Sequence, residues 1–134
     1  MDVPVARSSE CVIGITIPLP EPWAAQVTRV RSRAGDPFAD HIAPHVTIVP
    51  PTLIERDCLE DLRTHLRRVA ARTAPIRLHM AGTESFRPVS PVTYLVVASG
   101  AEQCDELHRR VRSQEGPLHR PTWQIGRASC RERV

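Results

Sequence analysis

The sequence contains no lysine, and all 18 of its basic residues are arginine. Aromatic residues make up only 4% of the 134 positions, and no apolar run approaches the roughly 20 residues that cross a bilayer. The start of the chain lacks the basic segment followed by a long apolar segment that marks a secretory signal. We therefore expect a cytoplasmic protein of one domain with no membrane partner.

Cysteine is also sparse. Cys11, Cys58 and Cys104 are widely spaced, and the sequence has no C-x-x-C pair. This excludes a zinc ribbon and a thioredoxin-like redox motif. Dispersed thiols are typical of small core side chains in a reducing compartment.

The excess of positive charge lies at the C-terminus. Residues 125–134 (IGRASCRERV) hold three arginines and one acidic residue, so residues 1–124 carry a formal net charge of +1. That balance excludes a polybasic nucleic-acid binder. The ten residues lack apolar periodicity and match the translation of a common sequencing-adapter stretch, ATC GGA AGA GCG TCG TGT AGG GAA AGA GTG. We interpret 125–134 as a foreign tail rather than a natural basic one, which makes 1–124 the domain and predicts a tail with no packed contacts and no regular element supported by burial.

Hydrophobic periodicity predicts an α+β domain with an antiparallel sheet and helices outside it. Strands are expected at 11–17, 45–49, 76–82 and 93–98. Helices are expected at about 22–35, after the Pro50-Pro51 pair, and at about 101–116.

Details of the helices follow from spacing. In the first helix Trp23, Val27 and Val30 form the stripe that should pack. In the second, Asp57 and Glu60 match a capping box. The arginines of the second helix are expected to form a solvated face: Arg63, Arg67, Arg68 and Arg72.

The triplet His45-Val46-Thr47 carries the clearest chemistry. On a strand, His45 and Thr47 project from one face with Cα atoms roughly 6.6 Å apart, while Val46 points the other way. An imidazole can move a proton near neutral pH, and a hydroxyl can donate a hydrogen bond to a phosphate oxygen. The pair is therefore a candidate phosphate site, although an isolated H-x-T on a strand is also compatible with a purely structural role.

The run PHVTIVPPT resembles the two-histidine (2H) phosphoesterase superfamily and, within it, bacterial proteins of the 2′-5′ RNA ligase family. Three further segments are similar to that family: CVIGITIPLPEP, GTESFRPVSPVTYLVV and EQCDELHRRVRSQEGP. The resemblance spans about residues 11–124. It implies a pseudo-symmetric bilobal fold, of which this chain would hold one lobe and part of the second.

The family carries two H-x-[T/S] motifs that face each other across a cleft, and the resemblance assigns His45 and Thr47 to the first. No other histidine is followed two positions later by Thr or Ser. Helix one begins near Glu21, 24 positions before His45, and an equal offset from Ala101 points to about position 125. We therefore interpret the chain as truncated before its second motif.

The resemblance implies metal-free histidine acid–base chemistry, without a cofactor, on RNA or on a nucleotide 2′,3′-cyclic phosphate. It leaves open whether the direction is phosphodiesterase or 2′-5′ RNA ligase. Because the second catalytic histidine is missing, we expect the chain as written to be inactive, so its standing as an enzyme is open. We expect a monomer.

Other interpretations concern single residues. Phe86 and Arg87 are candidate substrate-binding residues, or a loop that packs one and exposes the other. His41-x-x-x-His45 has the spacing of a helical metal pair, but Pro44 interrupts it and predicts no metal site. The remaining histidines of the elements are expected on polar faces: His65, His79 and His108. The competing function is a non-catalytic RNA- or nucleotide-binding module.

Overall fold

The computed structural model describes residues 3–85, 87–88, 93–118 and 132–133. The elements in chain order are β1 (Glu10–Pro18), α1 (Trp23–Arg33), β2 (His45–Glu55), a 3₁₀ turn (Arg56–Cys58), α2 (Leu59–Ala71), β3 (His79–Ser85), β4 (Thr93–Ser99), α3 (Ala101–Val111) and β5 (Glu132–Arg133).

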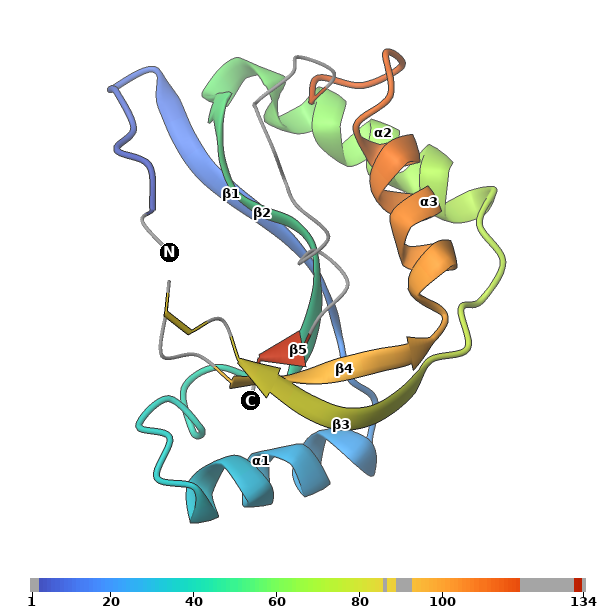
Figure 1. Cartoon of the computed structure of the whole chain (residues 1–134). Coiled ribbons are helices and arrows are strands. Elements are labelled where there is room, and N and C mark those ends of the chain that lie inside the picture. The colour runs from blue at the N-terminus through green and yellow to red at the C-terminus, as the bar shows by residue number, and fades with distance from the viewer. Residues whose placement is uncertain (1–2, 86, 89–92, 119–131, 134) are drawn as a thin grey trace.

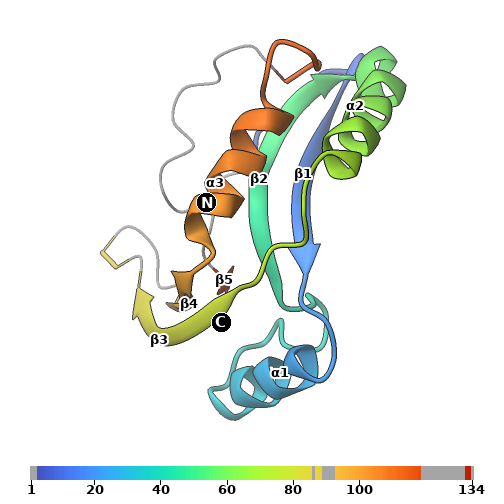
Figure 2. The same cartoon turned by 90° about the vertical axis from the view of Figure 1, so that its right-hand side faces the viewer.

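The strands form one sheet in the order β1-β2-β5-β4-β3, and every pair in it is antiparallel. Helices α2 and α3 lie together beside the antiparallel pair β1–β2, whose strands are connected through α1, whereas α1 lies apart from them, below β3 and β4 (Figures 1 and 2). This arrangement confirms the predicted α+β class with an antiparallel sheet.

The core lies between β2 and the two helices beside it. Its buried members come from β2, α2, α3 and the turn after α3: Val46, Ile48, Val49, Ile54, Leu62, Val69, Cys104, Val111 and Leu118. The inward side chains of β1 pack against this cluster at Cys11, Ile13, Ile15 and Ile17, as their alternation predicts. The core therefore fixes one face of β2 and leaves the other face for chemistry.

Strand β2 is longer than the sequence predicts, because it runs through Pro50 and Pro51 to Glu55. Ile13 pairs with Thr52 and Ile15 with Val49, so Gly14 alone lies opposite the two prolines. The prolines thus occupy a bulge, where a missing N–H does not break the regular ladder. The expectation that Pro50-Pro51 end the strand is wrong.

Helix α2 consequently starts late, at Leu59, after the 3₁₀ turn. Asp57 lies inside that turn, and no side-chain hydrogen bond caps the helix. The predicted capping box is therefore wrong. The four arginines of α2 (Arg63, Arg67, Arg68 and Arg72) are exposed, which confirms a solvated face.

Helix α1 buries a different face from the predicted one. Trp23 is 57% exposed and Val30 56% exposed, and the fully buried residue of the helix is Arg31. The expectation of a packed Trp23–Val30 stripe is wrong. The physical reason is that Arg31 finds three oxygen partners in the following loop, and their hydrogen bonds offset the burial of its charge.

Strands β3 and β4 form a hairpin; β4 lies where the sequence predicts it, whereas β3 begins and ends three residues later than the predicted 76–82. Within β3 only Met80 is even partly buried, whereas β4 buries Tyr94 and Val97. Between the β1–β2 pair and the β3–β4 hairpin lies β5, where Glu132 pairs with both Val46 and Leu95. Residues 132–133 of the segment that we interpret as foreign thus form a two-residue strand. The rest of 125–134 lies outside the described residues, so the foreign origin of this segment stays a prediction.

Candidate functional site

His45 and Thr47 lie on the face of β2 that points away from the core. Val46 and Ile48, which alternate with them, are 0% and 1% exposed, whereas His45 and Thr47 keep partial access to solvent. This is the alternation that the sequence predicts for a strand with one reactive face.

Strand β1 contributes to the same face. Pro18 pairs with His45 and Thr16 with Thr47, and directly opposite residues of antiparallel strands share a face. Both β1 residues are exposed. The face therefore carries a second hydroxyl, that of Thr16. Sequence reasoning missed Thr16, because the alternation of β1 shows only that it points outward and not that it lies opposite Thr47.

A backbone carbonyl determines which nitrogen of His45 carries the proton in the neutral ring. The His45 Nδ1–H donates to the Ala43 carbonyl oxygen at 2.7 Å, and a carbonyl can only accept. The neutral imidazole therefore has its lone pair on Nε2. A ring in this tautomer can accept a proton at Nε2, which is what a general base requires.

A second bulge in β2 involves a second histidine. Ile15 pairs with Val49 and Thr16 with Thr47, so Ile48 has no partner of its own on β1. The His108 Nδ1–H of α3 donates to the Ile48 carbonyl oxygen at 2.7 Å. His108 thus ties α3 to β2 beside the candidate site. A single sequence carries no signal for such a long-range side-chain contact.

His65, expected on a polar face, is buried with 4% exposure. Its Nε2–H lies 3.0 Å from the Val111 carbonyl and 3.1 Å from that of Arg110, at the end of α3. The expectation for His65 is therefore wrong, because these two acceptors satisfy the ring in the interior. His79 is exposed, as expected.

Partial burial lowers the pKa of Arg112, just beyond α3, by desolvating its guanidinium.

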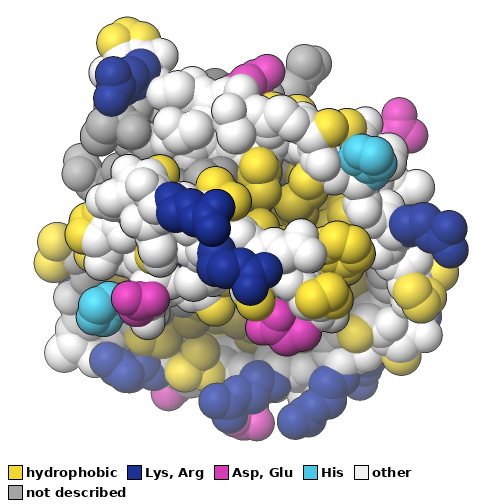
Figure 3. Space-filling model, turned by 90° about the horizontal axis from the view of Figure 1, so that it is seen from below, with side chains coloured by type: hydrophobic (Ala, Val, Ile, Leu, Met, Phe, Trp, Pro, Cys, Tyr) yellow, Lys and Arg dark blue, Asp and Glu magenta, His cyan; other side chains and the backbone are white. Residues whose placement is uncertain are grey.

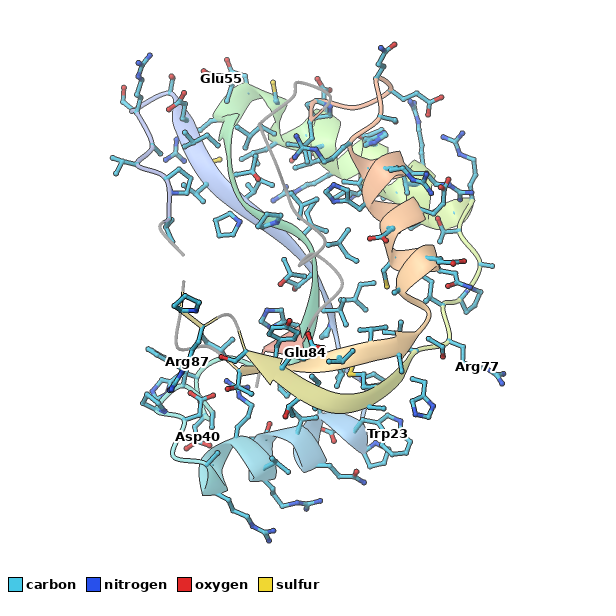
Figure 4. The ribbon with its side chains drawn as sticks, in the orientation of Figure 1. Trp23, Asp40, Glu55, Arg77, Glu84 and Arg87 are labelled. Atoms are coloured by element: carbon cyan, nitrogen blue, oxygen red, sulfur yellow. The ribbon has the colours of Figure 1, made fainter. Side chains whose placement is uncertain are left out.

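The two predicted substrate-binding residues, Phe86 and Arg87, follow β3 in the sequence, between β3 and β4. Arg87 is exposed in the turn after β3, and its backbone N–H donates to the Ser85 Oγ at 3.1 Å. It lies at the outer end of β3 in Figure 4, beyond Glu84. Phe86 lies outside the described residues. The binding role of both residues stays a prediction.

Across residues 3–85, 87–88, 93–118 and 132–133, no group of three or more His, Cys, Asp or Glu side chains could hold a metal ion. In the same part of the chain no helix is long and apolar enough to cross a membrane. Viewed from below, basic and acidic side chains are interspersed with apolar ones (Figure 3).

The chain is similar to known proteins both by a family model and by direct alignment. Residues 18–127 match the family model described as the 2′-5′ RNA ligase superfamily. A protein of Bacillus cytotoxicus named "Putative phosphoesterase" is 32% identical over 83 residues, covering 60% of this chain and 48% of its own length. A phosphoesterase of the same description from Bacillus cereus strain B4264 is 31% identical over the same shares. The chain thus spans about half the length of the curated relatives it matches. No solved structure matches it significantly.

Proposed function

The chain belongs to the 2′-5′ RNA ligase superfamily, and from that premise we propose that His45 and Thr47 form one half of a phosphodiester-processing site. The observation that carries this proposal is the shared, solvent-reachable face of β2, with the Nδ1–H of His45 held by Ala43. The substrate class is RNA or a nucleotide with a 2′,3′-cyclic phosphate.

In the proposed reaction, water attacks the phosphorus of the cyclic phosphodiester. One histidine accepts the proton of the water, the bond between phosphorus and one ribose oxygen breaks, and the second histidine protonates that oxygen. His45 suits the accepting role because its Nε2 carries the lone pair. The Thr47 hydroxyl donates to a non-bridging oxygen and holds the phosphate against His45. Run in reverse, the same proton transfers form a phosphodiester.

The second histidine is the part that this chain does not supply in the H-x-[T/S] pattern. General acid–base catalysis contributes about 10²–10⁴-fold for each positioned group. We therefore expect the chain as written to bind a phosphodiester but to turn it over slowly. The proposal places the missing group on a strand that would pair beside β2, the position where β5 pairs with Val46.

The decisive test compares the chain with a version in which a relative's second H-x-T strand follows residue 124. With a 2′,3′-cyclic nucleotide as substrate, the extended version should exceed the chain as written by about 10²–10⁴-fold in kcat. His45→Ala in the extended version should remove that gain. Thr47→Val should raise KM more than it lowers kcat, because the hydroxyl holds the substrate.

The control is Thr83→Val, which removes an exposed hydroxyl from β3 and should leave kcat and KM unchanged. If the chain ending at Val134 matches the extended version and His45→Ala changes nothing, the two-histidine mechanism is wrong.

A non-catalytic RNA- or nucleotide-binding module is the second candidate function. It becomes the better account if the natural coding sequence after residue 124 holds no second H-x-[T/S]. Under that function the extended version would bind a 2′,3′-cyclic nucleotide without turnover, and His45→Ala would weaken binding.

A further inference from the structure

Arg31 is a buried cation in a helix that is otherwise half-exposed. Its side chain is only 2% exposed, although arginine is almost never fully buried unless it is paired. It stands on α1, fourteen positions before His45. A charge held inside the protein at this place needs a reason beyond the packing of α1.

The guanidinium of Arg31 makes three contacts with the loop that leads into β2. Its Nε–H donates to the Asp36 Oδ2 at 2.8 Å, its Nη1–H to the Ile42 carbonyl at 2.5 Å, and its Nη2–H to the Phe38 carbonyl at 3.2 Å. Asp36 in turn accepts the Phe38 backbone N–H at 2.9 Å. One planar group therefore fixes both ends of the 36–42 loop.

The last of these contacts reaches the candidate site through consecutive carbonyls. The Ile42 carbonyl accepts from Arg31, the Ala43 carbonyl accepts from His45 Nδ1, and the Pro44 carbonyl accepts from the Leu19 backbone N–H at 3.0 Å. The direction of the Ala43 carbonyl depends on the two peptide units around it. Both of those units are held, one by Arg31 and one by Leu19, the residue that follows β1.

We propose that Arg31 is a positioning residue: by holding the Ile42 carbonyl, it aims the Ala43 carbonyl at His45 and keeps the proton of the neutral imidazole on Nδ1. The importance of this tautomer for catalysis rests on the proposed function. The contacts themselves do not, so the tautomer can be measured on the chain as it exists. Arg31 touches no reacting atom in this scheme and acts only through the loop.

The test measures the protonation of His45 in the ¹⁵N-labelled chain, by long-range ¹H–¹⁵N spectra at a pH where imidazole is neutral. The His45→Gln spectrum identifies its signals. In the unmodified chain the Nδ1–H form should dominate. Arg31→Met should at least halve the Nδ1–H fraction, because the loop loses its donor, and Arg31→Lys should fall between the two, because a lysine keeps the charge but not the planar fork.

Arg33→Met is the matched control, since it removes an exposed arginine from the same helix and should leave the tautomer unchanged. If Arg31→Met does not fold, Arg31→Lys and Asp36→Asn carry the test, and each should lower the Nδ1–H fraction. A folded Arg31 variant in which His45 keeps the tautomer of the unmodified chain overturns the inference.

A second readout uses the extended two-histidine version. Arg31→Met should lower kcat by about 10–100-fold, as loss of an orienting partner typically does, with KM within about threefold. If His45→Ala leaves turnover unchanged, the proposed function is wrong while the tautomer result still decides the role of Arg31. If His45→Ala removes activity but Arg31→Met alters neither tautomer nor kcat, only the role of Arg31 is wrong.

Discussion

The two strand pairs of the sheet, β1–β2 and β3–β4, differ in what covers them. In the first, β2 buries Val46, Ile48 and Val49 under α2 and α3, so one face is packed and the other is left for His45 and Thr47. In the second, β3 is exposed along most of its length, and the buried side chains belong to β4. The β1–β2 pair is thus supported by a packed core on one face, whereas the β3–β4 hairpin has little such support.

Two sets of contacts link the two strand pairs, and they also differ. One is the packing of α2 against α3, which we call the helix seam, and the other is the pairing of β5 with β2 and β4, which we call the strand seam. The helix seam joins α2 and the end of α3 through buried His65 and through the Arg110 Nη1–H, which donates to the Arg72 carbonyl at 3.2 Å. The strand seam is β5, which has two residues. Precise chemistry needs side chains held by packed elements. The candidate residues His45 and Thr47 are therefore the better supported ones, and substitutions in the core beside them should cost the most stability.

The largest expected effect comes from replacing a buried valine by alanine in β2 and comparing the loss of stability with that of the same substitution in β4. Val49→Ala, at a position with 0% exposure in the main core, should lower the free energy of unfolding by about 2–4 kcal/mol, from the lost methyl groups and the cavity they leave. Val97→Ala in β4, at 9% exposure and outside that cluster, should cost about 1–2 kcal/mol. Urea denaturation measures both. Equal losses of unfolding free energy for the two substitutions would mean that the two strand pairs are supported equally.

An intermediate effect is expected at the helix seam. A Cβ added at Gly116 would overlap the imidazole of His65, approaching its Cγ to 2.6 Å. Gly116→Ala should therefore cost about 1–3 kcal/mol of unfolding free energy through overpacking. Gly14→Ala is the control, because the nearest atom to its Cβ would be the Val49 carbonyl oxygen at an ordinary 3.7 Å.

The same clash can be checked by a double-mutant cycle. In a His65→Ala background the ring is gone, so Gly116→Ala should cost less than about 0.5 kcal/mol. If the cost of Gly116→Ala is the same in both backgrounds, the helix seam does not depend on the fit between this glycine and the ring.

The sequence predicts the reactive face of β2 well, because alternation is a local property. Val46 and Ile48 point inward by period alone, and His45 and Thr47 then have to point outward. The same rule locates β1 and β4. What it cannot supply is register, and for that reason neither Thr16 nor the bulge at Pro50-Pro51 could be placed opposite its partner.

Arg31 and His65 are buried for a physical reason that sequence patterns do not contain: their burial depends on partners far along the chain or on backbone carbonyls. Arginine is usually a surface residue. Arg31 is buried because Asp36, Phe38 and Ile42 provide oxygens for its guanidinium. His65 is buried because the end of α3 provides two more acceptors. Polarity patterns assign such residues to the surface, since the patterns contain no information on tertiary acceptors.

The smallest effect is expected at the strand seam, where the chain can be ended at Gln124. This removes β5 together with the segment that we interpret as foreign. A typical intramolecular hydrogen bond contributes about 1 kcal/mol net, and ordering each residue of β5 costs about 1–2 kcal/mol of backbone entropy. These terms nearly cancel for two residues, so the free energy of unfolding should change by less than about 1 kcal/mol. The matched control for this truncation is Glu132→Pro in the full chain, which removes one N–H from the strand and should have the same small effect.

A loss of unfolding free energy above about 2 kcal/mol on truncation would instead show that β5 joins the two strand pairs as firmly as the helices do. Residues 125–134 would then have to be treated as part of the domain.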